Sequence, residues 1–203
     1  EPNSGKSLVV LGLMSLLLGK TAKVGYFRPI IGDLDGDEKD NHLNTVLSYF
    51  DINMDYNKCY AFTRSEVLNL YNQGKSGDVI DEIIRKYKYL ENQFDIVLVE
   101  GTDFSHENNS LELDINMLIS KNLGLPVIIV ARGDKSDLKD IVDVVQLAYD
   151  TIKQEAKVLS IMINKVPEEN LQELKQSLIE RTHNTTNVTV IPSIKSLSSP
   201  TIK

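Results

Sequence analysis

Short apolar runs rich in β-branched residues alternate along this chain with longer segments of helical period, and this alternation restricts the fold more than any other feature. Each run is bounded by Gly, Pro, Asn or a charged residue, which is typical of strands buried on both faces of a sheet. The runs predict strands over 24–28, 95–99, 127–131, 158–163 and 188–191, and the segments between them predict helices over 7–18, 79–90, 111–123, 136–154 and 167–181. This order predicts an α/β fold, a doubly wound and mainly parallel sheet with helices on both faces.

Two segments of this pattern are unusual. The expected helix 7–18 is apolar nearly all round, so we expect it to pack against the centre of the sheet. The stretch 31–77 is polar, irregular and long for a connector within one compact domain. We expect this connector to hold short helices or part of a functional site.

The first seven residues carry the clearest chemical signal. They end in Gly-Lys-Ser, the close of the phosphate-binding loop G-x-x-x-x-G-K-[ST]. Gly5 lets the backbone turn its amides toward phosphate oxygens, Lys6 supplies a positive charge, and Ser7 offers a hydroxyl to Mg²⁺ at the start of a helix. The alternative is a coincidental helix start, because Gly-Lys-Ser is a common tripeptide. The predicted phosphate-binding residues of the loop are Asn3, Ser4, Gly5, Lys6 and Ser7.

The motif is incomplete in this chain. The first glycine of the loop falls one position before Glu1, and no strand leads into the loop. Such a strand lies centrally in the sheet, and without it ladder groups and apolar faces stay unsatisfied. We therefore expect the natural polypeptide to begin upstream by about 8–12 residues, one strand and a loop, so that the first strand of the fold is truncated.

Three polar residues stand at the ends of expected strands. Arg28 ends the first strand, Glu100 follows the second and Asn164 follows the fourth. An acid at the carboxyl end of a strand beside a phosphate loop holds Mg²⁺ or a water on it. An amide in that position reads the donor and acceptor edge of a base.

Together these residues resemble the dethiobiotin synthetase-like family, whose members carry a phosphate loop, a Tyr-x-Lys-Pro strand end, a Val-Glu-Gly strand end and a strand-terminal Asn. The likeness runs from Glu1 to about residue 194. Within the family the chain is most similar to the amino-terminal domains of long-form bacterial phosphate acetyltransferases. The segments that carry this likeness are 27–30 (Phe-Arg-Pro-Ile), 97–101 (Val-Leu-Val-Glu-Gly), 164–165 (Asn-Lys) and 188–192 (Val-Thr-Val-Ile-Pro).

The resemblance implies a role for each matching residue. Lys6 and Ser7 would bind phosphate and Mg²⁺, and Asp40 and Glu100 would be the second and third metal ligands. Asn164 would contact the base. The implied cofactor is Mg²⁺ with ATP or another nucleotide, and the implied partner is a nucleotide or a small anionic effector.

Several of these residues have a second interpretation. Arg28 stands where the synthetases have Lys, and an Arg that cannot lose its proton disfavours synthetase chemistry but leaves anion binding intact. Glu100 is alternatively a helix-capping or surface acid. Asp40 is alternatively part of a solvated acidic loop, and Asn164 is alternatively a turn residue.

The resemblance leaves three functions to weigh. The first is a regulatory or assembly domain of a phosphate acetyltransferase over residues 1–195, with 196–203 beginning a linker to an acetyltransferase domain downstream. In such enzymes that separate domain transfers the acetyl group between coenzyme A and phosphate. The second is a free-standing ATP- and Mg-dependent ligase of the dethiobiotin synthetase or cobyrinate amidating type. The third is a non-enzymatic module, either a nucleotide-gated switch or an oligomerisation domain. Whichever function holds, we expect the protein to be a homo-oligomer.

Composition excludes several partner classes. The chain has 22 Lys and Arg against 29 Asp and Glu, a net charge of −7, which disfavours nucleic acid and anionic membranes as partners. The apolar run at 8–19 is too short to span a bilayer.

The single cysteine, Cys59, cannot form an internal disulfide, which fits a reducing, cytoplasmic compartment, and we interpret it as a structural or surface residue. The histidines have no ligand spacing and are expected at the surface; they are His42, His106 and His183.

Overall fold

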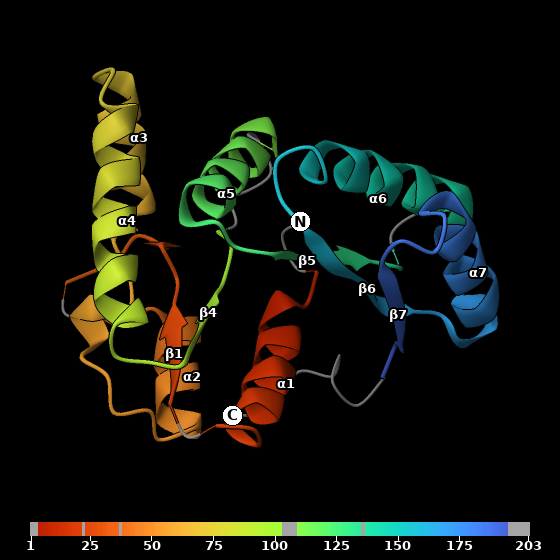
Figure 1. Cartoon of the computed structure of the whole chain (residues 1–203), viewed down its shortest axis with the longest axis horizontal. Coiled ribbons are helices and arrows are strands. Elements are labelled where there is room, and N and C mark those ends of the chain that lie inside the picture. Colours follow the sequence, from red (N-terminus) through yellow and green to blue (C-terminus); the bar gives the residue numbers. More distant parts are fainter. Residues whose placement is uncertain (1–3, 22, 37, 103–108, 135–136, 195–203) are drawn as a thin grey trace. The chain divides into compact units, whose positions relative to one another are not determined.

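The computed structural model of the chain describes residues 4–21, 23–36, 38–102, 109–134 and 137–194. The chain divides into two compact units, one formed by Glu1–Lys6 with Gly124–Lys203 and the other by Ser7–Leu123. Both units combine helices with strands that pair in parallel (Figure 1). The predicted α/β class with parallel strands is therefore confirmed.

The unit Ser7–Leu123 contains two parallel strand pairs among its described residues, β1 with β4 and β2 with β3. Helix α4 contacts both strands of the first pair, and α3 contacts both strands of the second. The elements that lie in this part of the chain are α1 (Lys6–Leu18), β1 (Val24–Phe27), β2 (Ile30–Ile31), α2 (Asn41–Tyr49), a 3-10 helix (Tyr56–Lys58), β3 (Phe62–Thr63), α3 (Arg64–Asn72), α4 (Ser76–Glu91), β4 (Ile96–Val99) and α5 (Asn109–Leu123).

The other unit is built on a three-stranded parallel sheet in the order β5-β6-β7. Each connection between neighbouring strands carries a helix, α6 between β5 and β6 and α7 between β6 and β7, as parallel pairing requires. The two helices contact each other, and they contact β5 and β7 respectively (Figure 1). The elements are β5 (Val127–Arg132), α6 (Leu138–Ile152), β6 (Val158–Val166), a 3-10 helix (Glu168–Asn170), α7 (Leu171–Arg181) and β7 (Asn187–Pro192).

The polar connector 31–77 holds short helices, as expected from its length. Helices α2 and α3, the 3-10 helix at Tyr56–Lys58 and the two-residue strand β3 lie in it, and β2 ends at its first residue. Its apolar residues join a core in which Leu43 and Cys59 pack with Met14 of α1 and Tyr26 of β1. The connector therefore forms part of the core that carries the end of β1.

Two helix predictions need correction. The helix expected to pack against the sheet through an apolar surface nearly all round buries one face only, because Val10 and Met14 are buried whereas Leu8 and Leu16 are 43% and 69% exposed. The helix predicted from Pro167 begins later. Pro167 has an extended ψ of 142°, a 3-10 turn follows it, and α7 starts at Leu171.

Some predictions concern residues that the structure does not describe. Asn3 of the predicted loop, His106 and the predicted linker 196–203 lie outside the described ranges. The predicted domain boundary at residue 195 stays a prediction for the same reason. Within the described part of the chain, no helix is both long enough and apolar enough to cross a membrane.

Candidate functional site

The carboxyl ends of β1 and β4 bring two predicted site residues together. The strands pair in parallel with Phe27 opposite Val99, so Arg28 and Glu100 leave the sheet at equivalent positions. The Glu100 amide donates to the Phe27 carbonyl at 2.9 Å, which continues the ladder by one bond. Arg28 is 8% exposed and Glu100 is 4% exposed, so Glu100 is not a surface acid.

The phenol of Tyr26 lies against the Glu100 carboxylate. Tyr26 precedes Arg28 by two positions in an extended segment, so both side chains point to the same side of the strand. Its hydroxyl donates a hydrogen bond to Oε2 of Glu100. Burial, and after it the charge of Glu100, raises the pKa of Tyr26 well above its usual value, so this hydroxyl keeps its proton and stays a donor.

Asp40 is the N-cap residue of α2 and the ion-pair partner of Arg28. Its Oδ1 accepts from the Leu43 amide at 2.9 Å and from Nη1 of Arg28 at 2.8 Å. Its own amide donates to the hydroxyl of Tyr56 at 2.7 Å. The side chain of Asp40 is only 9% exposed, which separates it from the exposed acids Asp33 and Asp35 of the same run.

Arg28 carries a positive charge beside both carboxylates. Burial alone would lower the pKa of Arg28, but the charges of Glu100 and then Asp40 outweigh this effect and raise it. The Nε atom of Arg28 is buried and has no hydrogen-bond partner among the described residues. We refer to Tyr26, Arg28, Asp40 and Glu100 as the Arg28 cluster.

A small hollow of about 260 Å³ adjoins this cluster. Ser7 at the start of α1 and His42 in the first turn of α2 line it, together with Glu100. The Oγ atom of Ser7 lies 2.5 Å from Nδ1 of His42. His42 is exposed, as is His183, which agrees with the surface placement expected for them.

The three predicted magnesium ligands all have protein partners in this arrangement. Ser7 is bonded to His42, Asp40 to Arg28 and Glu100 to Tyr26. Within the described ranges, no group of three or more His, Cys, Asp or Glu side chains is placed to hold a metal ion. Each of the three implied ligands thus already bonds a protein group in this geometry, and their role in metal binding stays a prediction.

The other unit holds the first part of the predicted phosphate loop. Gly5, directly before α1, has a φ of +83°, and a Cβ at this position would lie 2.0 Å from Nδ2 of Asn164. Only glycine fits both the backbone angle and the space. Ser4 is 1% exposed, and its Oγ has no hydrogen-bond partner among the described residues.

Asn164 holds this loop from the end region of β6. Its Nδ2 donates to the carbonyl of Ser4 at 3.1 Å, and its Oδ1 accepts from the amide of Lys165 at 2.9 Å. The side chain is 3% exposed. The geometry assigns Asn164 a bracing contact to the loop, whereas its predicted contact with a base stays a prediction.

Sequence reasoning missed three residues that complete these contacts. Tyr26 was detectable, because residues two apart in a strand share a side and Arg28 was already a candidate. His42 and Tyr56 carried no such signal. They reach Ser7 and Asp40 from 35 and 16 positions away in the chain, through tertiary packing alone.

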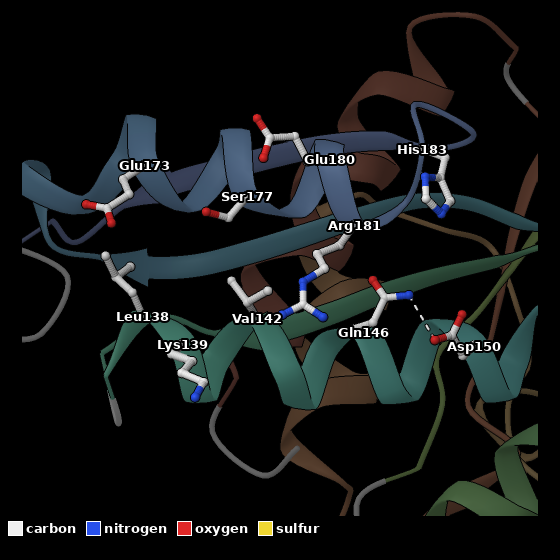
Figure 2. Close-up of a pocket in the computed structure, with 10 residues that line it drawn as sticks. All are labelled: Leu138, Lys139, Val142, Gln146, Asp150, Glu173, Ser177, Glu180, Arg181 and His183. Carbon is white, nitrogen blue, oxygen red and sulfur yellow. Dashed lines mark hydrogen bonds between the residues drawn. The ribbon is translucent and has the colours of Figure 1, made fainter.

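A larger groove of about 610 Å³ lies between α6 and α7 (Figure 2). Its charged groups are of both signs and several are paired. Asp150 accepts from Gln146 and Lys153, while Arg181 lies 3.2 Å from Asp143. Because none of the predicted site residues lines this groove and its charge is mixed, it is not a candidate for phosphate binding.

The parallel α/β fold with a glycine-turned loop before α1 is that of the phosphate-loop class of proteins. Residues 1–201 match a family model described as "AAA domain", and the chain belongs to this family. It is also similar to curated phosphate acetyltransferases. The one from Nitratidesulfovibrio vulgaris is 36% identical over 207 residues, which cover all of this chain and 29% of the relative.

Two further phosphate acetyltransferases show the same partial coverage. The protein from Synechocystis sp. is 34% identical over 182 residues, 89% of this chain and 26% of the relative. The protein from Pseudomonas aeruginosa is 26% identical over 168 residues, 80% of this chain and 23% of the relative. The chain therefore spans less than a third of the length of these relatives, and the resemblance to part of such enzymes is confirmed.

Proposed function

We propose that this chain is a nucleotide- or anion-binding domain with a regulatory or assembly role in a phosphate acetyltransferase. In the proposed enzyme a separate domain transfers the acetyl group between coenzyme A and phosphate. The partial match to relatives with that name supports the proposal, because the chain spans less than a third of their length.

The observation that carries the proposal is the geometry of the loop. Gly5 turns the backbone at φ +83° immediately before α1, a helix of 13 residues. The start of such a helix presents the positive end of its dipole, which favours an anion. The buried Oγ of Ser4 adds a hydroxyl with no partner among the described residues.

Calorimetric titration of the intact protein with ATP tests this proposal. Lys6→Ala removes the charge at the start of α1 and should weaken binding about tenfold or more, the loss of roughly 1.4 kcal/mol. Lys20→Ala is the matched control, because Lys20 is an exposed lysine just beyond the other end of the same helix. If wild-type protein binds no nucleotide, or both variants bind equally, the proposal is wrong.

An assay of acetyl transfer between coenzyme A and phosphate tests the regulatory part. We expect nucleotide to change the rate in the wild-type protein and in Lys20→Ala, and to have no effect in Lys6→Ala. ATP hydrolysis that depends on a carboxylate substrate would instead favour the ligase alternative. We further propose a homo-oligomer in the cytoplasm, which sedimentation and cell fractionation test directly.

A further inference from the structure

The Arg28 cluster neutralises two buried carboxylates, which a metal ion does in many nucleotide sites. Two carboxylates, Asp40 and Glu100, lie at the end of a sheet with at most a tenth of their surface exposed. Buried carboxylates are strongly unfavourable unless a positive charge or hydrogen-bond donors neutralise them. A resident counter-charge is therefore required in this part of the protein.

Arg28 supplies that counter-charge from within the chain. Its Nη1 contacts Oδ1 of Asp40 at 2.8 Å, and Arg28 follows β1 at the position that matches Glu100 after β4. Tyr26 provides Glu100 with a neutral donor. The guanidinium of Arg28 thus bonds Asp40, and the phenol of Tyr26 bonds Glu100.

The third predicted metal ligand, Ser7, also has a protein partner. Ser7 Oγ lies 2.5 Å from Nδ1 of His42 in the hollow that adjoins Glu100. A magnesium ion requires near-octahedral oxygen ligands, and here it would compete with a protein partner at Ser7, at Asp40 and at Glu100.

We propose that the Arg28 guanidinium takes the place of a divalent cation between Asp40 and Glu100, and that the chain therefore binds its phosphate-bearing ligand without Mg²⁺. An arginine suits this role better than a lysine. It stays charged at every physiological pH, and its planar fork presents several donors at once. The buried Nε, unpartnered among the described residues, is a further donor on the same group.

The first experiment compares the melting temperature of the intact protein in millimolar MgCl₂ with that in EDTA, without nucleotide. The wild type should melt at the same temperature in both. Arg28→Met removes the charge but keeps a side chain of comparable reach, so it should melt several degrees lower in EDTA and recover in MgCl₂. A wild type that Mg²⁺ stabilises, or an Arg28→Met that gains no response to Mg²⁺, overturns the inference.

Arg85→Met is the matched control. Arg85 forms a bidentate contact with Glu82 on the exposed surface of α4, so this variant loses an arginine–carboxylate pair away from the cluster. It should show no response to Mg²⁺, and a response as large as that of Arg28→Met would contradict the inference. If Arg28→Met does not fold, Arg28→Lys makes the same comparison, because an ammonium lacks the planar fork of donors with which Arg28 would replace the cation.

The second experiment measures ATP binding to the wild type in MgCl₂ and in EDTA. This step rests on the proposed function, and we expect equal affinity in the two buffers. A loss of tenfold or more in EDTA overturns the inference. Absence of binding in both buffers refutes the proposed function instead, while the melting comparison still decides whether Arg28 replaces the cation.

Discussion

The Nη1 atom of Arg28 lies 2.8 Å from Oδ1 of Asp40, and each of these side chains keeps only 9% of its surface exposed. The same Oδ1 also accepts the Leu43 amide in the first turn of α2. One carboxylate oxygen therefore joins the end of β1 to the start of a helix 12 positions further along the chain.

Asp40→Asn tests how much this pair stabilises the protein. Asparagine caps a helix as well as aspartate does, so the change removes the charge and keeps the cap. Breaking a buried ion pair leaves its partner uncompensated, and we expect a loss of about 3 kcal/mol. Urea denaturation measures this loss. Asp35→Asn, in the exposed part of the same acidic run, should change stability by less than about 0.5 kcal/mol.

Gly5→Ala tests the close approach between the loop and Asn164. The added Cβ would lie 2.0 Å from Nδ2 of Asn164, and the backbone would keep a φ of +83°. Gly36→Ala is the matched control, since Gly36 has a φ of +61° with no atom within 4 Å of its Cβ position.

Thermal denaturation should separate the two glycine variants. Gly36→Ala bears the backbone strain alone, about 1 kcal/mol, whereas Gly5→Ala must also displace a buried side chain and should lose clearly more. We expect Gly5→Ala to abolish ATP binding as well. Equal melting temperatures for the two variants would mean that Asn164 does not constrain the loop.

The long strands and helices could be predicted from sequence because their apolar patterns are continuous. The expected strand 127–131 and β5 at Val127–Arg132 differ by one residue. The end of β6 was less visible. It continues to Val166 through Asn164 and Lys165, two polar residues, and Lys165 has a φ of +61° that no hydrophobic pattern indicates.

The sequence predicted that the connector 31–77 holds short elements, but not where they begin and end. The two-residue strands β2 and β3 are too short to show any periodicity, and they exist because parallel pairing joins residues 32 positions apart. Helix α3 did carry a local signal. Thr63 and Glu66 form a capping box, which follows from their spacing alone.

In the site too, some positions could be predicted from the sequence and others could not. That Arg28 and Glu100 lie at the same edge follows from the parallel order of the fold, since carboxyl ends of parallel strands share one edge, whereas the pairing of β1 with β4 is seen only in the structure. That Asp40 would be a helix cap bonded to Arg28 does not follow, because the connector between them has no regular pattern. Only the tertiary structure therefore reveals which side chains bond the predicted ligands.

Acid denaturation should reveal the ion pair at the end of β5. Asp134 accepts from Nε and Nη2 of Arg132 at 2.7 and 2.8 Å, and these bonds lower the pKa of Asp134 in the folded state. Because the folded pKa lies below the unfolded value of about 3.9, this stabilisation is present above about pH 4 and is lost as the pH falls through the folded pKa.

Asp134→Asn should remove this dependence. The variant should lose up to about 1 kcal/mol at neutral pH, and the difference from wild type should shrink below about pH 4. Urea denaturation across this pH range measures it. Asp81→Asn, an exposed change on α4, should run parallel to the wild type. A difference between Asp134→Asn and wild type that grows as the pH falls would have the wrong sign for this ion pair.

The Cys59 thiol should be unreactive in the folded protein. Burial, and after it the charge of Asp55, raises the pKa of Cys59 to about 12, and its Sγ donates to the Asp55 carbonyl at 3.3 Å. Since only the thiolate reacts with a disulfide reagent, the raised pKa and the burial of the thiol both slow the reaction at pH 8. Ellman's reagent should therefore release one equivalent of chromophore rapidly in urea and almost none in native buffer. Rapid reaction in native buffer would place this thiol at the surface and contradict its position in the core beside Tyr26 and Leu43.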